Sequence, residues 1–86
     1  MFYVYILLEN NGMLYTGFSA DLRQRVKDHS AGKVESTRDR RPLKLVHYEA
    51  YVKESDARRR EKYLKTSEGK RFLKQQIRDL LEELNL

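Results

Sequence analysis

Apolar and polar positions alternate along this chain with periods that predict its elements one by one. The first element is the unbroken apolar run Phe2 to Leu8, whose β-branched, aromatic and aliphatic residues predict a strand buried on both faces. The segment 9–12 that follows ends in Asn-Gly, a strong hairpin signal because both residue types tolerate a positive φ. The return strand is expected at 13–18, which places Tyr5 and Tyr15 on adjacent antiparallel strands.

A helical period replaces the alternation after this hairpin. A turn at 17–21 offers Ser19 or Asp21 as the N-cap of a helix that runs to about Ala31, and Gly32 is a natural residue just past its end. The spacing of three and four residues then predicts one shared helix face. That face carries Leu22, Arg25, Val26 and His29.

The segment 33–44 has no period and predicts a basic loop closed by Pro42. A third strand is expected at 43–52, with Leu45, His47, Glu49 and Tyr51 alternating against Val46, Tyr48, Ala50 and Val52.

Two helices are expected in the last third of the chain. The first is capped by Glu54 or Ser55 and runs to about Lys65; its inward stripe is Ala57, Glu61 and Leu64. Residues 66–69 are expected to break the helix, and a last helix is expected from about 70 to 84. The order β-β-α-β-α-α predicts an α+β fold, a three-stranded antiparallel sheet flanked by helices.

Length and composition narrow the class of protein. A chain of 86 residues without cysteine predicts one domain, 1–86, with no disulfides and no thiolate metal site, as is typical of a cytoplasmic protein. The apolar start lacks a basic leader and is too short to span a bilayer, so neither a signal peptide nor a membrane partner is expected. The net charge of +5 favours an anionic partner such as nucleic acid, although the same charge is also typical of plain solubility.

Five polar residues on inward-facing positions are the candidate site. Glu61 lies on an apolar stripe, where a carboxylate needs a cation: an arginine in an ion pair, or Mg²⁺ as a hard-oxygen ligand. Arg25 could snorkel over the edge of the core or hold a phosphate in its planar fork. His29 could be a helix-end residue favoured by the helix dipole, or it could share a proton with a tyrosine or hold a phosphate.

Tyr5 and Tyr15 have an ordinary structural interpretation, since strands favour tyrosine. The pKa of a free phenol is near 10, which is too high for a general base at neutral pH unless cations beside it favour its ionised form. Arg25 and Mg²⁺ are expected to supply that effect.

These residues together resemble the GIY-YIG nuclease superfamily, most closely its small single-domain bacterial branch. The two signatures appear as Tyr3-Val4-Tyr5 and Tyr15-Thr16-Gly17, the segment 21–29 resembles the catalytic helix, and the segment 58–62 resembles the helix with the metal-binding glutamate. The stretches 37–38 and 41–46 are also similar to this branch. Tyr3 and Thr16 depart from the glycine and isoleucine of the signatures, and no asparagine follows the metal-binding helix at the position some members use.

The resemblance implies hydrolysis of a DNA phosphodiester with one divalent ion, Mg²⁺ or Mn²⁺. Tyr5 is expected to act as general base, and Tyr15 or His29 to orient the water or the phosphate, although the two tyrosines could exchange roles. Arg25 would steady the pentacoordinate phosphate and Glu61 would hold the ion. Larger members add a target-recognition domain for which this chain has no room, so low sequence specificity is expected.

The basic loop predicts a contact with the nucleic-acid backbone, although a solvated loop is the usual fate of a charge run. The residues expected there are Lys33, Arg38, Arg40, Arg41 and, from the helix beyond, Lys65. Two other functions remain open. One is a DNA- or RNA-binding module without catalysis, and the other is a protein-interaction domain that uses Leu80, Leu81 and Leu84. A monomer or weak homodimer is expected.

Overall fold

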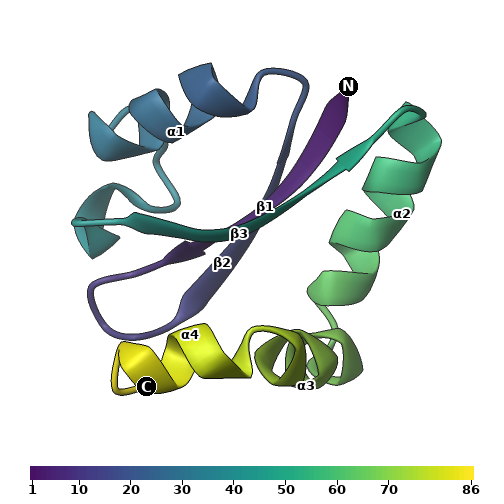
Figure 1. Ribbon diagram of the computed structural model, residues 1–86. Helices are drawn as coiled ribbons and strands as arrows, with labels where there is room; N and C mark the ends of the chain where they lie inside the picture. Colours follow the sequence, from purple (N-terminus) through teal and green to yellow (C-terminus); the bar gives the residue numbers. More distant parts are fainter.

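The computed structural model describes all 86 residues and contains a three-stranded antiparallel sheet in the order β2-β1-β3. Helix α1 covers one face of the sheet, and the later helices cover the other (Figure 1). The predicted α+β class and element order are confirmed. The strands are β1 Phe2–Leu8, β2 Leu14–Ser19 and β3 Lys44–Tyr51; the helices are α1 Leu22–Ser30, α2 Glu54–Leu64, α3 Ser67–Gln76 and α4 Arg78–Glu83, with a 3₁₀ turn, η1, at Arg38–Arg40.

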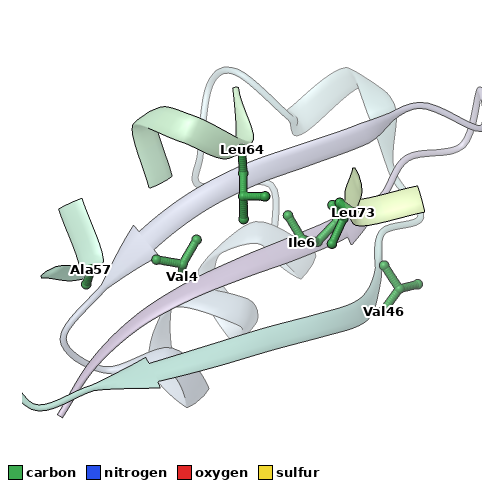
Figure 2. Close-up of a cluster of buried hydrophobic side chains, with 6 residues drawn as sticks. All are labelled: Val4, Ile6, Val46, Ala57, Leu64 and Leu73. Atoms are coloured by element: carbon green, nitrogen blue, oxygen red, sulfur yellow. The ribbon is translucent and has the colours of Figure 1, made fainter. Parts of the chain in front are cut away.

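Strand β1 is the central strand, as its continuous apolar run predicts, and four consecutive residues from Val4 to Leu7 are buried. Its two faces serve different purposes. Val4 and Ile6 point into the hydrophobic core, together with Val46 and with apolar residues of α2 and α3 (Figure 2). The other face carries Tyr5, which is also fully buried. Burying both faces of one strand fixes its register, because a slip by one residue would exchange the two sets.

The turns and caps agree with the expected chemistry in most places. Gly12 in the hairpin has φ +85° and Gly32 after α1 has φ +78°. Asp21 caps α1 by accepting a hydrogen bond from the backbone N–H of Gln24 at 3.1 Å. The N-cap of α2 is Lys53, not Glu54 or Ser55, which both lie in the first helical turn, where the acidic Glu54 suits the positive end of the helix dipole.

The predicted break between the helices, at 66–69, is wrong at its end, because helix α3 already begins at Ser67. The Thr66 hydroxyl accepts from the backbone N–H of Gly69 at 3.0 Å, so Thr66 starts a helix. The expected single last helix is also interrupted, at Ile77, which has φ −111°. Leu81 is buried beyond this break, and Leu80 and Leu84 pack against the core. Core packing of these leucines removes the basis for a partner surface on this helix.

Strand β3 departs from simple alternation at a bulge. Ile6 pairs with His47 whereas Leu7 pairs with Leu45, so Val46 is the extra residue. Leu45 therefore lies on the α1 side of the sheet, while His47, Glu49 and Tyr51 lie on the α2 side. The predicted grouping of Leu45 with these three residues is wrong, because one inserted residue reverses the face of everything before it.

A polar cluster fastens α2 to β3. The Arg60 guanidinium donates to both oxygens of Glu49 at 2.9 and 3.3 Å, the Tyr51 hydroxyl donates to the same carboxylate at 2.6 Å, and His47 Nε2 lies 2.9 Å from it. Burial alone would raise the pKa of Glu49, but these hydrogen bonds outweigh it and lower the pKa to about 2. The cluster holds the helix that also carries Glu61.

Because the pKa of Glu49 is depressed in the folded state, its contribution to stability should be present above pH 4.5 and lost as the pH falls toward 2. The shift corresponds to roughly 3 kcal/mol of unfolding free energy. Urea unfolding of wild type and Glu49→Gln across this range measures it. The two curves should differ most near neutral pH and converge in acid, whereas parallel curves would show that Glu49 contributes no pH-dependent stability.

None of the helices is long and apolar enough to cross a membrane.

Candidate active site

A chain of three buried side chains lies between the sheet and α1. The Tyr5 hydroxyl is 2.8 Å from His29 Nε2, and the opposite ring nitrogen, Nδ1, is 2.7 Å from the Thr37 hydroxyl. All three residues have no measurable exposure. Strand, helix and loop thus meet at one imidazole, and a contact of His29 with a tyrosine, one of the alternatives left open by the sequence, is present.

The absence of a side chain at Gly17 leaves room for the Tyr5 ring. Gly17 is the partner of Tyr5 across the β1–β2 ladder, and a Cβ added to it would overlap the ring and hydroxyl of Tyr5. A residue with any side chain would push the phenol away from His29. The glycine of Tyr15-Thr16-Gly17 is therefore a packing requirement of the site.

His29 is held as a neutral imidazole. Burial lowers its pKa below the ordinary 6.5, and the positive charge of Arg25 lowers it further. Both neighbours of the ring are hydroxyl groups, which can either donate or accept, so either neutral tautomer can be satisfied. The neutral ring can therefore donate a hydrogen bond at one nitrogen and accept one at the other.

Arg25 lies beside the Tyr5 hydroxyl, and this contact raises the pKa of the guanidinium, which stays charged. The effect on the phenol differs from the expectation that Arg25 would lower its pKa. Burial raises the pKa of Tyr5 and outweighs the lowering by Arg25, so the net shift is upward. In this structure Tyr5 is a neutral phenol with no contact to solvent.

Tyr15 is the more accessible of the two tyrosines. Its ring lies edge-on to His29, with centroids 5.2 Å apart, and is tilted against Tyr5 at 6.5 Å. Tyr15 is half-buried, and its hydroxyl has only a long 3.5 Å contact with the hydroxyl of Ser36. Tyr15 therefore shares the aromatic cluster of Tyr5 and His29 but can also contact water.

Glu61 approaches the site from α2, on the other side of the sheet. Because β2 is an edge strand, residues from the two faces can meet around that edge. Burial is the main cause of the raised pKa of Tyr5, and the negative charge of Glu61 adds the smallest contribution to it. Direct contacts join Tyr5, Tyr15, Arg25 and His29 on the α1 side of the sheet, whereas Glu61 acts on Tyr5 only through its charge.

Two basic side chains form ion pairs with the Glu61 carboxylate. Lys65 Nζ lies 3.1 Å from Oε2, and an Arg58 guanidinium nitrogen lies 3.7 Å from Oε1. The Arg58 guanidinium also stacks on the Phe18 ring, 3.7 Å from its centroid. The expected cation beside Glu61 is present, supplied by residues one helical turn before and after it.

The side chains near Glu61 fit a divalent-ion site in which the protein supplies one carboxylate ligand. No three His, Asp or Glu side chains come together in the structure. Mg²⁺ is commonly held by one or two carboxylates, with water and substrate phosphate completing its shell. Arg58 and Lys65 are more than half exposed, so both side chains have room to move away from Glu61. Glu61 suits an ion that binds together with a phosphate substrate.

The basic residues expected to contact nucleic acid divide into three kinds. Arg40 pairs with Glu9 at 3.3 Å, and Arg41 donates to the backbone carbonyl of Arg38 at 2.9 Å. Lys33 and the side chain of Arg38 are exposed near the loop that carries Ser36 and Thr37. Lys65 belongs to the Glu61 ion pair.

A family model described as the GIY-YIG catalytic domain matches residues 1–75. This chain belongs to the GIY-YIG family.

Relatives of this GIY-YIG domain include a UPF0213 protein of Staphylococcus epidermidis, 42% identical over 73 residues that cover 84% of this chain and 89% of the relative. A UPF0213 protein of Haloquadratum walsbyi is 40% identical over 81 residues, or 91% of each chain. The solution NMR structure of a UPF0213 protein from Bacillus halodurans superimposes with a TM-score of 0.55 at 38% identity, covering 85% of this chain and 82% of the other. Membership in the GIY-YIG family supports a nuclease-type function on nucleic acid.

Sequence reasoning assigned no role to Thr37, Ser36 or Arg58 in this GIY-YIG domain. The spacing of Arg58 and Lys65 around Glu61, three and four residues, is a helical pattern that could have predicted both ion pairs. No local pattern marks Thr37, because its contact with His29 depends on how the loop folds back over α1.

Proposed function

We propose that this protein is a divalent-metal-dependent endonuclease that hydrolyses phosphodiester bonds in nucleic acid, with DNA as the expected substrate, Mg²⁺ or Mn²⁺ as the ion and the cytoplasm as the compartment. The observation that carries the proposal is the contact of Arg25 and two tyrosines with one another and with His29 in a GIY-YIG domain, and we add Glu61 of α2 as the metal ligand. The whole chain, 1–86, would act as one catalytic domain of low sequence specificity.

In this proposal the two tyrosines have different roles. Tyr15 places its hydroxyl against the attacking water and accepts its proton, because it is the phenol with access to solvent. Tyr5 is a positioning residue whose buried hydroxyl is held by His29, and through it by Thr37. This assignment departs from the expectation of Tyr5 as base, for the reason that a base must reach the proton it removes.

Arg25 and Glu61 would stabilise charge at the reacting phosphate. The Arg25 guanidinium remains positive and can donate two parallel hydrogen bonds to phosphate oxygens as negative charge builds up. Glu61 would hold the divalent ion, which when bound supplies positive charge for the departing oxygen. Lys65 would release Glu61 and turn to a phosphate, and Lys33, Arg38, Arg40 and Arg41 would contact the backbone beyond.

Glu61→Ala should abolish cleavage, with a loss of at least about a hundredfold, since it removes the one carboxylate available to the ion. Labelled linear, single-stranded and branched nucleic acids are incubated with Mg²⁺ or Mn²⁺, and wild type is compared with the variant and with wild type in excess chelator. Glu68→Ala on the exposed start of α3 is the matched control and should cleave normally. Full activity of Glu61→Ala, or of wild type in chelator, would refute the metal-dependent mechanism.

A second function, nucleic-acid binding without catalysis, is favoured by one observation. Glu61 is already neutralised by Arg58 and Lys65, which is also what a purely structural ion pair requires. In that case wild type and Glu61→Ala would bind the same nucleic acids with similar affinity, and neither would cleave them.

A further inference from the structure

A groove of about 520 Å³ lies between α1 and β3, on the same sheet face as the candidate active site but on the other flank of α1. Its lining combines two tyrosines of the sheet, two aliphatic residues of α1 and two basic residues at its rim. These are Tyr3, Tyr48, Leu22, Val26, Arg23 and Lys27. None of the six has a role in the proposed cleavage.

The two tyrosines form an aromatic surface in this groove. Their rings meet edge to face, with centroids 6.3 Å apart and planes at 60°. Tyr48 is nevertheless 55% exposed. A single exposed aromatic residue on a strand needs no explanation. An exposed ring that is held by a second ring inside a concave, aliphatic-walled groove is arranged to receive a flat apolar partner.

The charge at the rim identifies the kind of partner. Arg23 and Lys27 lie one helical turn apart on α1, are exposed, and form no ion pair in the structure. The acidic residue nearby, Asp21, uses its carboxylate to cap the helix. A ligand with a flat ring and adjoining negative charge matches this combination, and a nucleotide has both.

We propose that the groove binds one unpaired nucleobase, stacked on Tyr48, with its flanking phosphates held by Arg23 and Lys27. The proposal rests on the proposed function, because it extends the same nucleic acid past α1. A base within a duplex has both faces covered by its neighbours, so only a base that is splayed out can enter the groove. Since α1 with its side chains is about 10 Å across, that base would lie within a few nucleotides of the phosphate at Arg25. The substrate class would be nucleic acid with unpaired nucleotides near the cleaved bond.

Binding is measured by fluorescence anisotropy with a labelled single strand and with a blunt duplex of the same sequence, both in chelator so that no cleavage occurs. Tyr48→Ala should weaken single-strand binding about tenfold, the typical value of one base stacked on an aromatic ring, and should leave duplex binding nearly unchanged. Tyr48→Phe keeps the ring and should bind like wild type. Phe72→Ala, which removes an exposed ring on α3, is the matched control and should have no effect.

The double variant Arg23→Gln, Lys27→Gln should reduce the salt dependence of single-strand binding by about two phosphate contacts. Equal losses on single strand and duplex in Tyr48→Ala, or no loss on either, would overturn the proposal. Conversion of a dimer to a monomer by Tyr48→Ala would assign the groove to a second copy of the chain and would also overturn the proposal.

Nucleic-acid cleavage is measured in a separate experiment with Mg²⁺. If Tyr48→Ala selectively loses single-strand binding but wild type cleaves nothing, the proposed nuclease activity is refuted and the nucleobase site in the groove stands. If wild type cleaves normally and Tyr48→Ala binds single strands like wild type, the nucleobase site alone is refuted.

Discussion

Replacing Tyr15 with phenylalanine is expected to slow nucleic-acid cleavage by about 10²- to 10⁴-fold, the usual cost of losing a general acid or base. The reason is access: Tyr15 is only half-buried, whereas Tyr5 is fully buried with its hydroxyl 2.8 Å from His29. Phenylalanine at position 15 keeps the ring contacts with Tyr5 and His29, so the fold should be unaffected. Single-turnover cleavage together with thermal unfolding measures both effects.

Tyr5→Phe is the matched comparison for this experiment, since it removes the other phenolic hydroxyl. It leaves His29 Nε2 buried without a partner, which should cost about 1–3 kcal/mol of unfolding free energy. Tyr15→Phe should therefore lose activity at unchanged stability, and Tyr5→Phe should lose stability. If Tyr5→Phe abolished cleavage at unchanged stability while Tyr15→Phe cleaved normally, Tyr5 would be the base after all.

Gly17→Ala should destabilise the protein by about 3 kcal/mol and also disrupt the site. The added methyl group would overlap the Tyr5 ring, which is fully buried, so the ring must shift within a packed interior. For a chain of this length, that loss corresponds to a fall in Tm of roughly 12–24 °C. Cleavage measured well below the lowered Tm should still be reduced, because the displaced phenol no longer meets His29.

Gly12→Ala is the control for Gly17→Ala on the same hairpin. Gly12 has a positive φ but no clash, because the nearest atom, in Leu86, would be in ordinary van der Waals contact at 3.7 Å from the added carbon. It should cost only about 1–2 kcal/mol of backbone strain and leave cleavage intact. Stability of Gly17→Ala equal to that of wild type would show that the Tyr5 ring can move, and that the tight β1–β2 contact is not required.

The sequence predicted the fold through local patterns that persist in the folded protein. The alternation along β1 placed Tyr5 on the face opposite Val4 and Ile6, and the spacing of Arg25 and His29 placed both on one face of α1. The errors occur where a tertiary contact overrides the local pattern. The bulge at Val46 and the break at Ile77 each let apolar residues reach the core, and neither has a turn residue to mark it.

The candidate site divides in the same way. The sequence by itself placed the two phenols on two strands and the guanidinium, the imidazole and the carboxylate on two helices. It could do so because the direction of a side chain follows from the period of the backbone. Only the tertiary structure decided what each group can do. Burial made Tyr5 a neutral, enclosed phenol and left Tyr15 within reach of water. A loop folded over α1 brought Thr37 to His29, and two neighbouring cations closed around Glu61. These properties depend on desolvation and on contacts between distant segments, which no local spacing records.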